Sequence, residues 1–380
     1  MAELIFWLSV FVVLYSNFGY PLLLITLASL RRSAPRPDLT PDAGLPSVAV
    51  LVAAHNEERH IEERVINLLT IDYPADRLRI FVGSDGSTDR TVGILRELSN
   101  ERLEVIATEM RRGKASVLND LAALAGQEIL VLTDANTSFK PDALRHLLRH
   151  FTRPEVGCVC GELCLVGNGG DNQDHIYWRY ERLLKQHESG IGALLGANGG
   201  VYALRRSAYR AIPPNTIVDD FWVSMQVLEA GDRCVYEQDA QAFELVPERI
   251  SDEFKRRVRI GMGNFQALRR FYGMLHPRHG TVAFAFLSHK VMRWLVPHAM
   301  VLALVSSCML ADRAAYGAML CGQLAFYGSA WVGWRYSCRG ITPRVLRLPL
   351  FFVSMNLGLL LGWWQYMRGE ATGIWVRSAR

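Results

Sequence analysis

An uncharged apolar stretch near the N-terminus most constrains how this chain can fold. It runs from Leu4 to Leu30 and is long enough to cross the hydrocarbon core of a bilayer, which is about 30 Å thick. No basic segment precedes it and it exceeds the apolar core of a signal peptide, so a membrane helix is favoured over a cleaved signal. Arg31, Arg32 and Arg36 follow directly. Because basic residues collect on the cytoplasmic side of membrane helices, we expect the next segment in the cytoplasm.

Apolar residues return toward the C-terminus. The candidate membrane spans there are Pro297–Ala311, Ala314–Trp334 and Leu346–Met367. The segment just before them carries His289, Lys290 and Arg293, which are costly against lipid, so we expect an interfacial helix or one whose polar face lines a protein cavity. Arginines flank the last span on both sides, and both flanks favour the cytoplasm. One C-terminal segment should therefore be re-entrant or interfacial.

These patterns predict four parts. They are an N-terminal transmembrane helix in residues 1–32, a cytoplasmic α/β domain in residues 37–255, amphipathic interfacial helices in residues 256–296, and transmembrane helices with a tail in residues 297–380. The chain is 50% hydrophobic and 21% charged, with a net charge of +5. That composition excludes a disordered chain, and the small positive charge argues against a nucleic-acid-binding protein.

Strand-like runs alternate with amphipathic helical stretches in the middle of the chain. The strand-like runs are Ser47–Ala54, Leu78–Gly83, Leu103–Ala107 and Glu128–Thr133. The helical stretches are Glu57–Leu69, Thr88–Leu98, Lys114–Ala125 and Pro141–Phe151. Such alternation is typical of βαβ units, so the sequence predicts an α/β domain around a mostly parallel sheet.

Polar side chains collect where three of the predicted strands end. The segments are His55–Glu57, Ser84–Asp89 and Thr133–Asn136. Ligands bind at the carboxyl ends of strands in open parallel sheets, so we expect one site here. Each segment alone is also explained as turn and helix-cap chemistry, which Asp and Asn favour.

The first strand end limits which ligand this site can take. A dinucleotide fold needs G-x-G-x-x-G there, whereas this chain has Asn56-Glu57-Glu58. These carboxylates repel a bare diphosphate. A diphosphate can still bind where a divalent metal bridges it to a carboxylate, and Mg²⁺ and Mn²⁺ favour hard oxygen ligands.

Short motifs follow one another along the chain in an order that is specific as a set. They are AAHNEE and GSDGSTDRT at the first two strand ends, Gly113-Lys114-Ala115 followed by Leu118-Asn119, Thr133–Asn136, Gly196–Gly200, Val218–Phe221 and Arg256–Ile260. Over nearly its whole length the chain resembles the membrane-integrated family 2 glycosyltransferases, which include polysaccharide synthases. The resemblance implies a Rossmann-like, nucleotide-sugar-binding domain of the GT-A fold, flanked by transmembrane helices.

The resemblance also implies roles for individual residues. It assigns donor binding to Glu57, Asp85, Lys114 and Asp134, acceptor binding to Asn198 and Gly199, Mg²⁺ or Mn²⁺ binding to Asp134 and Asn136, and catalysis to Asp219, Asp220 and Arg259. Asp220 would be the general base that takes the acceptor proton. Plainer explanations stand beside these roles, since paired Asp residues stabilise a helix N-terminus, Lys114 can be solvated and Arg259 can contact anionic lipid.

The chain departs from the family pattern at three motifs. Asn136 stands where the metal-binding DxD motif has its second acid, which predicts weaker metal binding with most of the charge on Asp134. Arg256 and Ile260 replace the Gln and Trp of the QxxRW motif. Ser84 replaces the first Asp of the DDGSTD motif, which is a mild change. Because that Trp helps hold the growing sugar in polymerising relatives, processive synthesis is left open.

The expected function is therefore an inverting glycosyltransferase at the inner membrane. It would move a sugar from a nucleotide donor, expected to be UDP-linked, to a polysaccharide or lipid-linked acceptor. Expected partners are the donor, the acceptor, membrane lipids and the proteins of an export or assembly complex, with no nucleic acid. One alternative is an enzyme that adds a single sugar to a polyprenyl phosphate or glycolipid. A second alternative is a non-catalytic membrane scaffold that keeps this fold. A third is a nucleotidyltransferase, but that function explains neither the Asp219-Asp220 pair nor the membrane helices.

Overall fold

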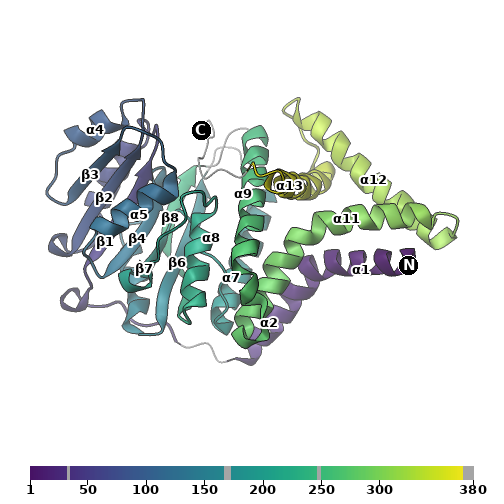
Figure 1. Ribbon diagram of the computed structural model, residues 1–380, viewed down its shortest axis with the longest axis horizontal. Coiled ribbons are helices and arrows are strands. Elements are labelled where there is room, and N and C mark those ends of the chain that lie inside the picture. Colours follow the sequence, from purple (N-terminus) through teal and green to yellow (C-terminus); the bar gives the residue numbers. More distant parts are fainter. Residues whose placement is uncertain (32–34, 167–172, 246–249, 371–380) are drawn as a thin grey trace. The chain divides into compact units, whose positions relative to one another are not determined.

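The computed structural model describes residues 1–31, 35–166, 173–245 and 250–370. The chain divides into two compact units. Figure 1 labels most of their strands and helices. The sheet unit is built from the described parts of residues 31–169 and 185–248, and the helical unit from those of residues 1–30, 170–184 and 249–370. Helix α7 (Gln173–Ile191) begins in the helical unit and ends in the sheet unit.

A mixed sheet forms the centre of the sheet unit. Its eight described strands lie in the order β3-β2-β1-β4-β7-β6-β8-β5. The strands are β1 (Val48–Ala54), β2 (Leu78–Asp85), β3 (Leu103–Thr108), β4 (Ile129–Asp134), β5 (Thr137–Phe139), β6 (Val156–Val166), β7 (Tyr202–Arg205) and β8 (Arg233–Leu245). Among these strands, four of the seven pairings are parallel and three are antiparallel. The predicted α/β class with a mostly parallel sheet is thus confirmed.

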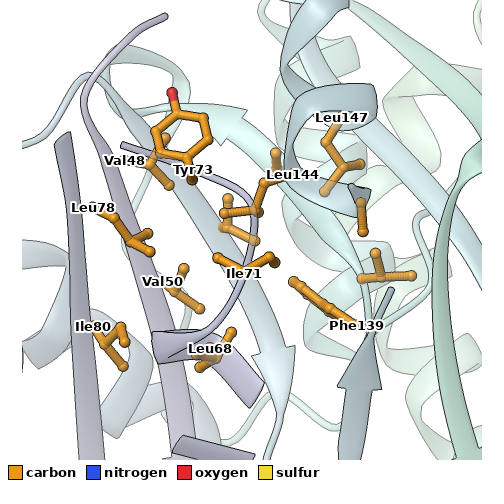
Figure 2. Close-up of a cluster of buried hydrophobic side chains, with 14 of the residues drawn as sticks. Val48, Val50, Leu68, Ile71, Tyr73, Leu78, Ile80, Phe139, Leu144 and Leu147 are labelled. Carbon is orange, nitrogen blue, oxygen red and sulfur yellow. The ribbon is translucent and has the colours of Figure 1, made fainter. Parts of the chain in front are cut away.

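Helices cover both faces of this sheet. They are α3 (Ile61–Leu69), α4 (Thr91–Glu97), α5 (Lys114–Leu124), α6 (Ala143–Leu148) and α8 (Asp219–Glu229). Figure 2 shows Val48 and Val50 of β1 in one buried cluster with Leu68 of α3 and Leu144 of α6. Successive strand side chains point to opposite faces, so the intervening residues of β1 face the other side.

Helix α5 packs on that other side, against β1 and β2. A side chain at Gly83 of β2 would overlap Val117 and lie 3.3 Å from Leu121. Glycine at position 83 therefore allows α5 to approach the sheet closely. Lys114 is the first residue of α5, so this packing also fixes the backbone position of the lysine.

Long apolar helices make up the helical unit. Its helices are α1 (Ala2–Leu14), α2 (Tyr20–Leu30), α9 (Ile250–Phe271), α10 (Thr281–Ala285), α11 (Met292–Met309), α12 (Ala314–Ser337) and α13 (Arg344–Met367). Within the described residues, three helices are long and apolar enough to cross a membrane: Ala2–Leu30, Thr281–Met309 and Arg344–Met367. The first two each contain a π-helical turn, Tyr15–Gly19 and Phe286–Val291. Helix α12, also predicted as a span, does not reach the same apolarity.

The charged side chains of the helix Thr281–Met309 are packed inside the helical unit. Arg293 forms an ion pair with Glu181 of α7, and the buried His289 lies 3.8 Å from the same carboxylate. These contacts agree with a helix whose polar face is lined by protein. The predicted boundary at residue 296 falls inside this helix, next to Pro297, and an interfacial location for residues 256–296 stays a prediction.

Candidate active site

Two neighbouring strand ends are joined by hydrogen bonds at one edge of the sheet. His55 Nδ1 lies 2.7 Å from the backbone oxygen of Asp85. Glu57 N donates to Thr91 Oγ1 at 2.8 Å. The ends of β1 and β2 therefore lie side by side, as predicted for parallel neighbours. Asp85 is the last residue of β2, and Glu57 lies in the segment that follows β1.

Asp85 holds the loop that precedes α5. Its side chain is fully buried. Oδ1 accepts from Arg112 N at 2.6 Å, and Oδ2 accepts from Gly113 N at 2.9 Å. Gly113 has a φ of +91°, which a residue with a side chain rarely adopts. Asp85 thus positions the backbone from which Lys114 extends, while its expected contact with the nucleoside stays a prediction.

Lys114 lies between two of the predicted acidic residues. Its Nζ is 2.9 Å from Asp134 Oδ1 and 3.0 Å from Asp219 Oδ2. The lysine side chain is 21% exposed and that of Asp219 is 11% exposed. Burial opposes the charge of Lys114, but the carboxylates of Asp134 and Asp219 outweigh it and raise the lysine pKa above its usual range. Lys114 is therefore a permanent cation at this site and not a solvated side chain.

Asp220 and Asp134 face the same glycine. A Cβ placed on Gly199 would lie 3.2 Å from Asp220 Oδ2 and 3.8 Å from Asp134 Oδ2. The other oxygen of Asp220 accepts from Phe221 N at 2.7 Å. Burial and the charge of Asp219 raise the pKa of Asp220. The structure thus brings Asp134, Asp219 and Asp220 together, although the last two come from a helix far along the chain.

The second position of the predicted metal motif fits a metal through its amide oxygen. Asn136 Nδ2 donates to Glu244 Oε1 at 3.2 Å. An ionised carboxylate only accepts hydrogen bonds, so the amide nitrogen faces Glu244 and Asn136 Oδ1 takes no part in this contact. Asp134 and Asn136 then supply carboxylate and carbonyl oxygens, the ligand types that Mg²⁺ and Mn²⁺ favour. Within the described residues, no group of three or more His, Cys, Asp or Glu side chains is arranged to hold a metal ion.

The loop predicted to face the acceptor is held from inside the sheet unit. Asn198 Nδ2 donates to Gly161 O at 2.6 Å, and its backbone N donates to Cys160 Sγ at 3.2 Å. Lys185 of α7 donates to Asn198 Oδ1. The Asn198 side chain therefore holds the loop that places Gly199 beside the carboxylates, and its acceptor contact stays a prediction.

Sequence reasoning missed a second cation near Asp134. Arg64 of α3 is 2% exposed and donates from Nη2 to Thr133 Oγ1 at 2.7 Å. Its guanidinium also lies over the Phe139 ring, 4.3 Å from the centroid. Burial lowers its pKa to about 9, and Asp134 partly offsets that effect. In the sequence Arg64 is one of several charged residues of an amphipathic helix, so no signal distinguished it.

Arg259 is the one predicted site residue outside the sheet unit. It lies on α9 in the helical unit. Its expected contact with the leaving diphosphate stays a prediction.

Comparison with a protein family identifies the same stretch of chain. Residues 49–212 match the family described as Glycosyl transferase family 2. The matched stretch includes Asp85, Lys114, Asp134 and Gly199. The matched stretch ends at residue 212, so Asp219 and Asp220 lie beyond it in the sequence.

Curated relatives are similar over part of their length. Poly-beta-1,6-N-acetyl-D-glucosamine synthase of Staphylococcus epidermidis is 28% identical over 231 residues, which are 59% of this chain and 56% of the relative. The synthase of the same name from Staphylococcus aureus (strain COL) is 27% identical over 243 residues, which are 62% of this chain and 58% of the relative. The chain therefore matches a little over half the length of these relatives.

A solved structure shares the fold along nearly the whole chain. It is a mannosyltransferase from Pyrobaculum calidifontis in complex with GDP-Man and Mn²⁺, with 22% identity and a TM-score of 0.74. The match covers 97% of this chain and 100% of that chain. The predicted GT-A fold is thereby confirmed.

Proposed function

We propose that this chain inverts the anomeric centre of a nucleotide sugar as it transfers the sugar to a polysaccharide or lipid-linked acceptor. The chain carries a glycosyl transferase family 2 domain and is therefore a glycosyltransferase. The observation that carries the proposal is the gathering of three carboxylates and one ammonium beside Gly199. Such a transfer needs a base for the acceptor and charge to hold a diphosphate. Both chemistries are present within a few ångströms of one another.

Asp220 is the proposed base. The acceptor hydroxyl gives its proton to Asp220 Oδ2 while its oxygen forms a bond to the anomeric carbon. The bond from that carbon to the diphosphate oxygen breaks on the opposite face, and the electron pair leaves with the diphosphate. A single displacement of this kind converts an α-linked donor into a β-linked product. The raised pKa of Asp220 brings the base closer to working pH, where general-base catalysis is most effective.

The donor is proposed to lie along the strand ends. Glu57 and Asp85 would bind the nucleoside, and Lys114 and Arg259 would contact the diphosphate through charge-assisted hydrogen bonds. Asp134 and Asn136 would hold a divalent Mg²⁺ or Mn²⁺, which supplies Lewis-acid stabilisation of the leaving diphosphate when bound.

Two products are compatible with this chemistry. The synthases among the relatives support a polymer as the product. Ile260, which stands where polymerising family members have Trp, instead favours a single sugar added to a polyprenyl phosphate or glycolipid. The length of the product formed from a labelled donor decides between them.

The apolar helices support a membrane location. Three described helices can cross a bilayer, and Arg31 and Arg36 favour a cytoplasmic sheet unit at the inner membrane. In that place the enzyme meets soluble nucleotide sugars and a membrane-bound acceptor, and it could pass product to an export or assembly complex.

One experiment tests the proposal and its non-catalytic alternative. The detergent-purified protein is incubated with UDP- and GDP-linked sugars, with and without Mn²⁺ or Mg²⁺, and nucleotide release is measured. Asp220→Asn should lower kcat by at least about 100-fold while donor affinity is kept. Asp76→Asn, a matched change at an exposed aspartate, should leave kcat unchanged. Transfer by Asp220→Asn at the wild-type rate would remove Asp220 from the mechanism.

A further inference from the structure

Lys114 occupies the position of a cation among the carboxylates of the site. Its ammonium contacts Asp134 Oδ1 at 2.9 Å and Asp219 Oδ2 at 3.0 Å. Asp134 is also the residue with which a divalent metal would be held under the proposed function. A divalent metal prefers carboxylate oxygen as a ligand, so the ammonium and a metal at Asp134 would compete for the same negative charge.

The carboxylates outnumber this ammonium. Asp220 Oδ2 faces the same glycine, Gly199, as Asp134 Oδ2, so three carboxylates gather around one lysine. Asp219 Oδ2 is buried, and among the described residues it has the ion pair with Lys114 but no hydrogen bond. In the part of the chain that the structure describes, the three carboxylates thus outnumber the two cations near them, Lys114 and Arg64. A group of higher charge can replace Lys114 there.

The local structure fixes the lysine backbone but leaves its side chain able to move. Asp85 holds the Gly113 amide just before α5. Beyond that point the side chain has four flexible methylene groups, and its ammonium forms ion pairs with Asp134 and Asp219 among the described residues. Lysine is a compact point charge on a rotatable stem, unlike the rigid fork of arginine. Once displaced, its charge needs another anion nearby, and the donor diphosphate is the anion that the proposed reaction brings.

We infer that Lys114 is the resident cation of the donor-free site and that it exchanges for a divalent metal when the nucleotide diphosphate binds. The inference rests on the proposed function and names how that site is regulated. The metal takes the carboxylate contact that Lys114 gives up, and Lys114 turns to the diphosphate. Metal and nucleotide therefore bind with positive coupling, and each strengthens the other by the same factor. Without nucleotide, Lys114 keeps the metal affinity low.

Lys114→Met tests the exchange because methionine keeps the length of the side chain and removes its charge. Binding of Mn²⁺ is measured by electron paramagnetic resonance, first with metal alone and then with UDP or GDP present. In the wild-type protein nucleotide should tighten Mn²⁺ binding. In Lys114→Met, Mn²⁺ alone should bind at least about tenfold more tightly than in the wild type, and nucleotide should add little. Weaker or unchanged binding of Mn²⁺ alone would overturn the inference.

Two further variants separate charge from folding. Lys114→Arg keeps the positive charge and should keep the weak binding of Mn²⁺ alone. Lys140→Met removes an exposed lysine that pairs with Asp142 at 3.5 Å, and should behave like the wild type. Thermal unfolding shows whether Lys114→Met is folded, and its melting temperature should rise more on addition of Mn²⁺ than that of the wild type. An equal rise in both proteins would count against the exchange.

The outcome separates this inference from the proposed function. Tighter Mn²⁺ binding by Lys114→Met supports the exchange even if the wild-type protein releases nucleotide from none of the donors, in which case the proposed function fails alone. Normal transfer by the wild type, together with unchanged Mn²⁺ binding by Lys114→Met, would leave the function in place and remove the exchange.

Discussion

Restoring the missing acid of the metal motif should destabilise this protein. In Asn136→Asp, the hydrogen bond from Asn136 Nδ2 to Glu244 Oε1, 3.2 Å long, is replaced by two facing carboxylates. Glu244 is 7% exposed, so water screens the pair poorly. The sequence change that looks like a repair therefore creates a repulsion that the sequence alone does not reveal.

The size of the effect follows from these contacts. A hydrogen bond to a charged group contributes about 1.5–3 kcal/mol, and like charges near 4 Å repel by about 4 kcal/mol at the effective dielectric of a protein surface. Side-chain rotation and uptake of a proton relieve part of this, so we expect a net loss of about 3 kcal/mol. For a domain of this size that lowers the melting temperature by about 6–12 °C. The deficit should shrink as the pH falls, because a proton shared by the two carboxylates removes the repulsion.

A reciprocal exchange supplies the matched control. In the double variant Asn136→Asp with Glu244→Gln, the new amide donates to the new carboxylate, so the hydrogen bond is kept with its partners exchanged. Its melting temperature in EDTA should return to within about 3 °C of the wild type. Because it carries carboxylates at both positions of the motif, it should also bind Mn²⁺ more tightly than the wild type. If Asn136→Asp alone melts with the wild type in EDTA, or if the double variant is no more stable than the single one, the reasoning is refuted.

Two further predictions concern the proposed base and the helix packing. Asp219→Asn removes a charge that raises the pKa of Asp220. Because Asp220 must be deprotonated to act as a base, the acidic limb of the plot of kcat against pH should move to lower pH. An unchanged acidic limb would argue against an effect of Asp219 on the pKa of Asp220. Gly362→Ala on α13 places a Cβ 2.8 Å from the Gly261 Cα of α9. The free energy of unfolding should therefore fall by about 1–3 kcal/mol, and the melting temperature by several degrees. Gly322→Ala on α12, where a Cβ meets nothing within 4 Å, is its control and should melt like the wild type.

The parallel half of the sheet could be predicted from sequence because its signals are local. β1 is buried along its whole length, and it lies between β2 and β4 as a βαβ order requires. Parallel neighbours end at the same edge, so the polar residues that follow them were expected in one place. The proximity of Asp134 to Lys114 agrees with that expectation.

The other half depends on contacts that no local pattern encodes. β7 is only four residues long, and antiparallel pairings place it between β4 and β6. Glu244 reaches Asn136 across 108 positions of sequence because β5 and β8 pair with Thr137 opposite Glu244. The amide at position 136 therefore looks like a defect in the sequence, whereas in the fold it matches a buried carboxylate.

Two cations lie near Asp134, and their different anchoring indicates different tasks. Arg64 is fixed by a hydrogen bond to Thr133 and by its stacking on Phe139, so it cannot leave when a ligand arrives. Its positive charge interacts with Asp134, so we expect it to weaken the attraction of that carboxylate for a metal. Lys114 is 21% exposed and is held by two ion pairs, which an incoming cation can replace. A site that binds metal and diphosphate together and releases both after transfer needs one charge that stays and one that exchanges.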